Sequence, residues 1–77
     1  MEEDEDIINA RIAINVQKYR LRKNLSIADL AFKCGMDRAN LSRIEHGWGN
    51  HRINTIQKIA NALGVSLREL MEKPDSN

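Results

Sequence analysis

Cysteine, proline and aromatic residues are scarce in this chain of 77 residues. It has one cysteine, one proline and three aromatic residues, against 42% apolar residues overall. A single cysteine cannot form an internal disulfide, so a disulfide scaffold is excluded. No apolar run is long enough for a membrane span, and the acidic N-terminus is unlike a signal peptide, so we expect a cytoplasmic protein without a membrane partner. Many aliphatic residues with few aromatic ones favour a small core of packed helices.

The sequence also lacks the residue groups that enzymes and metal sites need. It has no paired carboxylates, no nucleophile beside a base and no phosphate-binding glycine loop, which argues against an enzyme. His46 and His51 have no companion cysteine or carboxylate at ligand spacing, so we expect no metal and no cofactor. Cys34 falls on the apolar face of a predicted helix, so we interpret it as a small hydrophobic side chain buried in the core. Redox sensing is the alternative, and only Lys33 within one turn favours it.

The net charge of +1 conceals an uneven distribution. Residues 1–6 hold five acids and no base, whereas residues 7–65 hold ten bases and three acids, a local net of +7. A body so basic attracts phosphates. We predict a disordered acidic lead at 1–6, one folded domain at 7–72 and a tail at 73–77.

Residues 26–46 have the pattern of two short capped helices joined by a glycine turn. Ser26 is a helix cap with Asp29 at the third helical position, and Gly35 supplies the left-handed residue that ends the first helix. Asp37 is expected to cap the second helix, over 38–46. Ala31 is small enough to let the two helices touch. This is the arrangement that places a helix in the major groove of DNA.

Three further helices are predicted around this pair, giving an all-α fold of five helices. Helical spacing runs from residue 7 to about 23, with an apolar stripe that ends at Tyr19. Asn54 or Thr55 begins the next helix, which stops at Gly64, and Ser66 caps a last short helix through residues 70–71. The apolar positions of the first stripe are Ile8, Ile12, Val16 and Tyr19.

From about residue 12 to residue 70 the chain resembles the phage repressor and Cro-type helix-turn-helix proteins, also called the xenobiotic-response-element family. The resemblance implies a compact lambda-repressor-like domain that binds double-stranded DNA sequence-specifically as a homodimer and regulates transcription, for example as a repressor. The chain departs from the family at Ile27, where a DNA-bracing glutamine is usual. The matching residues are Arg20, Leu25-Ser26, Leu30-Ala31, Gly35, Leu41-Ser42-Arg43-Ile44-Glu45, Gly47, Ile59-Ala60, Ala62-Leu63-Gly64-Val65-Ser66 and Leu70.

Base reading is predicted at the start of the second motif helix, because those residues enter the groove first. Arginine can donate two hydrogen bonds to guanine, although it can equally hold a phosphate, and an alanine methyl can meet thymine. The resemblance implies the same role for Arg38, Ala39 and Arg43. The full set of predicted base-reading residues is Arg38, Ala39, Asn40, Ser42 and Arg43.

Phosphate contacts are predicted on both sides of the motif. Amides at a helix start point outward at Ser26 and Ile27. The ring of Trp48 either lies along the sugar-phosphate edge or packs over the domain. The remaining phosphate contacts are implied by the resemblance, which places them at His46, Asn50, His51 and Arg52.

The resemblance also implies an ion pair between Arg20 and Glu45 that holds the reading helix at its angle. A dimer surface is expected on the last two helices, and the alternative is that these residues only close the core. The dimer candidates are Ile53, Leu67, Leu70 and Met71.

Other functions remain open for a domain of this kind. In size the chain resembles the controller proteins of restriction-modification systems. An antitoxin would bind a toxin through the acidic lead or the C-terminal residues, and an activator would touch RNA polymerase. A protein-interaction module is a further alternative, against which the +7 body counts. The acidic lead could also compete with DNA for the basic face.

Overall fold

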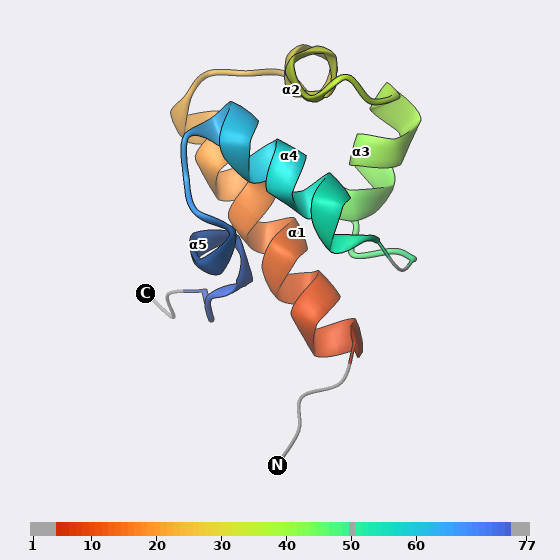
Figure 1. Ribbon diagram of the computed structural model, residues 1–77, viewed down its shortest axis with the longest axis vertical. Helices are drawn as coiled ribbons and strands as arrows, with labels where there is room; N and C mark the ends of the chain where they lie inside the picture. The colour runs from red at the N-terminus through yellow and green to blue at the C-terminus, as the bar shows by residue number, and fades with distance from the viewer. Residues whose placement is uncertain (1–4, 50, 75–77) are drawn as a thin grey trace.

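The computed structural model describes residues 5–49 and 51–74 and folds them into five helices (Figure 1). Within these residues no strand occurs, so the all-α prediction is confirmed. None of the described helices has both the length and the apolar character needed to cross a membrane. The helices are α1 (Glu5–Arg22), α2 (Ile27–Cys34), α3 (Arg38–Glu45), α4 (Ile53–Leu63) and α5 (Leu67–Met71).

Helix α1 begins earlier than the sequence pattern indicated. Glu5 and Asp6 form its first turn, so the prediction that they belong to a disordered lead is wrong for these two residues. Their carboxylates lie where the helix dipole favours negative charge, which explains the earlier start. Residues 1–4 of the predicted lead lie outside the described residues. At the other end the chain leaves the helix near Asn24, which has a φ of 56°.

Two helices begin with complete capping boxes. The Ser26 hydroxyl accepts from the amide of Asp29 at 2.9 Å, and the Asp29 carboxylate accepts from the amide of Ser26 at 3.1 Å. Ser66 and Glu69 repeat this arrangement at the start of α5, with both distances at 3.0 Å. Each box satisfies two amides that would otherwise lack a partner within the helix.

The starts of α3 and α4 differ from expectation. Asp37 occupies the cap position of α3, but its side chain makes no capping hydrogen bond, so the predicted cap is wrong in that respect. Helix α4 begins at Ile53 rather than at Asn54 or Thr55, and Arg52 before it makes no side-chain cap either. Both helices bury apolar side chains against their neighbours, and this burial compensates for weak capping.

The core lies between α1 and the other four helices. Helix α1 packs against α3, α4 and α5, while α2 packs against α3 and α4 (Figure 1). Ala31 on α2 is only 2% exposed, and its small side chain lets α2 and α3 approach closely. The other main core side chains are Ile12, Val16, Leu30, Leu41, Ile44, Ile56, Ile59, Leu63 and Leu70.

Candidate nucleic-acid interface

Helix α3 presents one apolar face to the core and one polar face to solvent. Leu41 and Ile44 are 0% and 2% exposed, and they fix the helix against the domain. The polar face combines two guanidinium groups with an amide and a methyl group. Its exposed residues are Arg38, Ala39, Asn40 and Arg43, and Ser42 is half-buried beside them.

The turn before α3 is fixed by backbone geometry at Gly35. This residue has a φ of 68°, in the left-handed region that favours glycine. The amide of Met36 donates to the carbonyl of Ala31 at 3.0 Å, which closes the end of α2. Partly buried Met36 packs against the core below the corner. The crossing of α2 and α3 is therefore set by local structure as well as by packing.

An ion pair joins the end of α1 to the end of α3. Arg20 Nε donates to Glu45 Oε2 at 2.6 Å, and Arg20 Nη2 donates to Glu45 Oε1 at 3.0 Å. The third guanidinium nitrogen, Nη1, donates to the carbonyl of Leu25 at 2.9 Å. The side chains of Arg20 and Glu45 are only 13% and 4% exposed. This two-pronged geometry holds the last turn of α3 at a fixed orientation.

Two amide side chains of α1 reinforce this connection, and sequence reasoning missed both. Gln17 Nε2 donates to the carbonyl of Glu45 at 2.7 Å, and Asn9 Nδ2 donates to the carbonyl of Gly49 at 2.9 Å. The sequence carried one signal: residues 9, 13, 17 and 20 share a face of α1 beside its main apolar stripe. Helix α1 thus anchors α3 and the loop after it at three points.

A third missed polar residue lies inside the core. Asn15 is 1% exposed, and its Nδ2 donates to the carbonyls of Leu70 and Glu72, each at 2.8 Å. A polar residue within an apolar helical face requires such partners. Asn15 fixes the end of α5 against α1.

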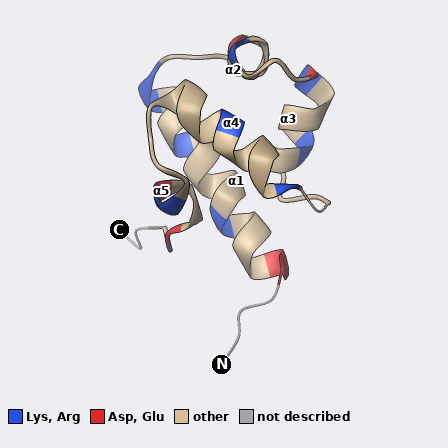
Figure 2. Ribbon diagram, viewed as in Figure 1, with Lys and Arg blue, Asp and Glu red and all other residues tan. Residues whose placement is uncertain are grey.

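Basic residues surround a polar hollow beside α3. The hollow has a volume of about 340 Å³. Figure 2 shows basic segments at both ends of α3 and at the start of α4, on one side of the molecule. Cations around a polar concavity suit an anionic group. The hollow is lined by Asn40, Arg43, Ile44, Gly49, His51, Arg52 and Thr55.

Two histidines of the loop after α3 contact backbone carbonyl groups through their rings. His46 Nδ1 lies 2.7 Å from the carbonyl of Ser42, and His51 Nε2 lies 2.8 Å from the carbonyl of Trp48. The rings of His46 and Trp48 stack with centroids 4.6 Å apart. Trp48 remains 60% exposed, so its ring does not pack into the domain core. Asn50, another predicted phosphate contact, lies outside the described residues.

The start of α2 does not offer both predicted amides. The amide of Ser26 already donates to Asp29, so the prediction that this amide meets phosphate is wrong for the structure as it stands. The capping box engages it because Asp29 occupies the third helical position. Ile27 begins the helix, and its side chain packs against the core.

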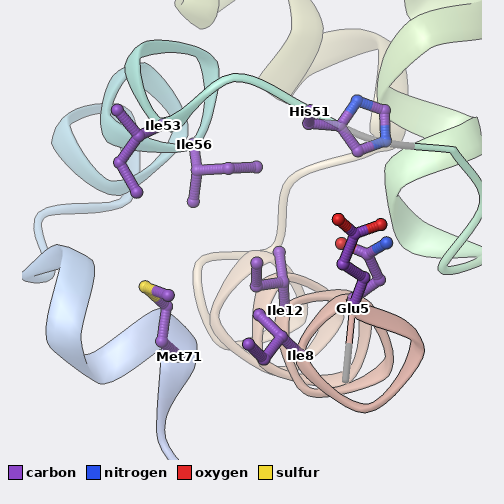
Figure 3. Close-up of a pocket in the computed structure, with 8 residues that line it drawn as sticks. Glu5, Ile8, Ile12, His51, Ile53, Ile56 and Met71 are labelled. Atoms are coloured by element: carbon purple, nitrogen blue, oxygen red, sulfur yellow. The ribbon is translucent and has the colours of Figure 1, made fainter. Parts of the chain in front are cut away.

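The four predicted dimer residues fall into three levels of exposure. Leu70 is fully buried and closes the core, so its assignment to a dimer surface is wrong. Leu67 and Met71 are partly buried against the core, whereas Ile53 is 55% exposed. A groove of about 270 Å³ lies beside these residues. Figure 3 shows Ile53 and Ile56 on one side of it and Met71, Ile8 and Ile12 on the other. This groove is the accessible apolar surface near the predicted dimer residues.

Cys34 and the histidines show no features of a reactive or metal centre. Burial raises the pKa of the Cys34 thiol, and the charge of Lys58 opposes that shift only in part. The thiol lies 3.9 Å from the carbonyl of Lys58. No cluster of three potential metal ligands occurs within residues 5–49 and 51–74.

Two short helices crossing at a glycine turn, with an exposed basic second helix, define the helix-turn-helix class of proteins. Comparison with known proteins gives the same result. The chain belongs to the HTH_3 helix-turn-helix family, which it matches over residues 16–70.

Individual relatives in this family are transcription factors and controller proteins. The chain is 37% identical over 71 residues to a hypothetical transcription factor of Neisseria meningitidis, covering 92% of this chain and 67% of the relative. A crystal structure of the hypothetical transcription factor NHTF from Neisseria superposes with a TM-score of 0.86, covering 96% of this chain and 85% of that chain at 35% identity. The control protein C.BamHI of Bacillus amyloliquefaciens is 41% identical over 58 residues, which are 74% of this chain and 72% of that protein.

A solved nucleoprotein complex is also similar. The controller protein C.Esp1396I in that complex superposes with a TM-score of 0.72 at 26% identity, covering 94% of this chain and all of that chain.

Proposed function

We propose that this chain is a sequence-specific DNA-binding transcriptional regulator that acts as a dimer on a palindromic operator. Helix α3 would enter the major groove. The observation that carries the proposal is the exposed polar face of α3, held rigid from behind by the pairing of Arg20 with Glu45. A binding helix must keep a fixed angle to the groove, and this ion pair provides such a constraint.

Base contacts are assigned to the exposed face of α3. Arg38, Ala39 and Asn40 lie in its first turn, where helix-turn-helix proteins meet base edges. Arg43 lies one turn further and also borders the polar hollow, so it can reach either a base or a phosphate. Ser42 is half-buried and carries a smaller share of the contact.

Phosphate contacts are assigned to the loop between α3 and α4 and to the start of α2. Arg52 and His51 line the hollow beside α3, where a phosphate would lie between them and Arg43. Trp48, stacked on His46, presents an exposed ring to the sugar-phosphate edge. At the start of α2 we assign a phosphate contact to the amide of Ile27 alone, because the amide of Ser26 donates to the Asp29 carboxylate.

A dimer would double the number of base pairs that one α3 can read. The groove bordered by Ile53 and Met71 is the proposed contact, with Leu67 beside it. In this proposal the chain acts as a regulator in the cytoplasm and not as an enzyme. The similarity to C.BamHI favours control of restriction-modification genes as the biological setting.

Selection from a random duplex library at two salt concentrations tests the proposal. We expect a palindromic sequence to be enriched, with affinity that falls steeply as salt rises, because each neutralised phosphate releases counterions. Arg38→Ala should relax the preference at one position of the enriched sequence. Lys33→Ala is the matched control, because Lys33 is an exposed cation on α2 away from the polar face of α3. Recovery of no sequence would favour a toxin or another protein as the partner.

A further inference from the structure

His51 lies where two hollows of the molecule meet. It lines the polar hollow beside α3 and also the apolar groove between α1 and α4 (Figure 3). The chain has two histidines, His46 and His51. Imidazole is the side chain that ordinarily changes its charge between about pH 5 and pH 8. The charge of the polar hollow therefore depends on how many protons the His51 ring carries.

The hydrogen bond of the His51 ring fixes which nitrogen is left for a ligand. Nε2 lies 2.8 Å from the carbonyl oxygen of Trp48. A carbonyl only accepts hydrogen bonds, so Nε2 carries a hydrogen and donates it. In the neutral ring Nδ1 is then an acceptor without a hydrogen, and it cannot bond a phosphate oxygen. His51 can donate to a phosphate through Nδ1 only after the ring has taken up a second proton.

The bond from Nε2 belongs to a loop that is held on both sides of its acceptor. The amide of Trp48 donates to the carbonyl of Arg43 at 3.0 Å. The carbonyl of the next residue, Gly49, accepts from Asn9 Nδ2 at 2.9 Å. Turning Nε2 toward a ligand would remove the side-chain donor from the Trp48 carbonyl, which costs free energy. Nδ1 is therefore the nitrogen that serves a ligand at lower cost.

Two guanidinium groups share the polar hollow with His51. A Cβ placed on Gly49 would lie 3.7 Å from Arg43 Nη2 and 3.9 Å from His51 Nε2, so both side chains lie against this glycine. Arg52 lines the same hollow. A phosphate among these three side chains adds negative charge beside the His51 ring. Such a neighbour favours the protonated form of an imidazole.

On the other side, His51 shares the apolar groove with one acid. Glu5 of α1 lines this groove together with His51 (Figure 3). The Glu5 side chain is exposed, and its charge is present in the free and in the DNA-bound protein alike. The charge that changes when DNA binds is the phosphate in the polar hollow, so this change determines whether a proton is taken up.

We propose that His51 is a proton-dependent phosphate ligand, so that this chain binds DNA more tightly as the pH falls from about 8 to about 5.5. The inference rests on the proposed DNA-binding function, because it needs a backbone phosphate in the polar hollow. On binding, Nδ1 takes up one proton from solvent and donates it in a charge-assisted hydrogen bond to a phosphate oxygen, while Nε2 stays with Trp48. Because a phosphate contact carries no sequence information, matched and mismatched duplexes should gain equally.

Titration of the full chain with a selected operator and with a scrambled duplex of equal length tests the proposal. We expect affinity for both duplexes to rise about tenfold across this pH range, the size of one charge-assisted hydrogen bond. His51→Gln keeps a donor at the position of Nε2 but does not titrate, so its affinity should stay nearly constant. Calorimetry in two buffers of different ionisation enthalpy should show proton uptake by the unaltered protein and none by His51→Gln.

His46 provides the matched control. Its Nδ1 lies 2.7 Å from the carbonyl of Ser42, so it too is bonded to the backbone through one ring nitrogen. It is not among the residues that line the polar hollow. His46→Asn keeps a donor near the position of Nδ1 and removes the titration of this ring. This variant should still bind DNA more tightly at lower pH.

Two results would overturn the inference and leave the DNA-binding function intact. One is an affinity that does not change across the pH range. The other is a pH dependence that persists in His51→Gln and disappears in His46→Asn. If the protein bound no duplex at any pH, the proposed function itself would be overturned, and this inference with it. The melting temperature of each variant at both ends of the range shows whether it is folded.

Discussion

Arg20 and Glu45 join the first and third helices through two hydrogen bonds, although 25 residues separate them in the chain. Both side chains are largely withdrawn from solvent, and Gln17 bonds the backbone of Glu45 beside them. A buried ion pair adds little net stability against an apolar replacement, but loss of one partner leaves the other charge uncompensated. The pair therefore matters most for the orientation of α3.

Replacing Glu45 with alanine should lower both stability and DNA affinity. We expect a loss of about 3 kcal/mol in the free energy of unfolding, because Arg20 would remain buried without its partner. Thermal or urea unfolding measures the first effect, and titration with the selected operator measures the second. Gln17→Ala removes a single hydrogen bond and should cost about 1 kcal/mol. An unchanged melting temperature for Glu45→Ala would contradict this role.

Arg38 and Arg52 should differ in how their loss affects DNA binding. Arg38→Ala should cost about 1–3 kcal/mol and relax the preference at one base position, as expected for a residue that reads a base. Arg52→Ala should weaken binding to all sequences alike and reduce the salt dependence by about one counterion. Titrations with matched and mismatched operators at several salt concentrations separate the two. Identical profiles for both variants would refute the division between base and phosphate contacts.

The two capping boxes should make stability sensitive to acid. Hydrogen bonds from the amide and hydroxyl of Ser26 lower the pKa of Asp29 below its ordinary 3.8, and those of Ser66 lower the pKa of Glu69 below its ordinary 4.5. A carboxylate with a lowered pKa stabilises the folded state above its unfolded pKa, and this contribution disappears as pH falls through the lowered value.

The melting temperature should therefore decrease as the pH is lowered from 6, with most of the decrease occurring at pH values under about 4.5. The double variant Asp29→Asn, Glu69→Gln should start lower and lose less with acid. A parallel fall in both proteins would assign the acid sensitivity to other groups.

Cys34 should be unreactive in the folded protein. Burial raises the pKa of its thiol above the ordinary 9.0, so little thiolate forms at neutral pH. Alkylation by iodoacetamide should be slow in buffer and fast in denaturant, when the thiol is exposed. Because the raised pKa belongs to the folded state, its stabilising contribution is present below pH 9 and is lost at more alkaline pH. Rapid alkylation of the folded protein would support the redox alternative.

Local sequence was sufficient for the helices and the turn at the centre of the motif. The capping box of Ser26 and the left-handed Gly35 depend on residues a few positions apart, and the structure has both. The start of α4 was harder to predict, because Arg52 provides no side-chain cap and the helix is held by burial of Ile56 and Ile59. Boundaries set by packing leave weaker signals in the sequence than boundaries set by capping.

The exposed face of α3 was likewise predictable, since Leu41 and Ile44 mark its buried side by their spacing alone. Contacts between distant segments were not. Asn9, Asn15 and Gln17 bond carbonyls that lie 28 to 57 residues away in the chain. Nothing in local spacing identifies those carbonyls as partners, because any exposed backbone oxygen can accept such a bond.

The chain by itself determined its helical class, the position of the glycine turn and the basic character of its body, because these follow from short-range spacing and from composition. Tertiary structure alone decided that Leu70 closes the core while Ile53 stays exposed. Burial is a property of all neighbours together, and a single sequence does not specify those neighbours until the helices have assembled.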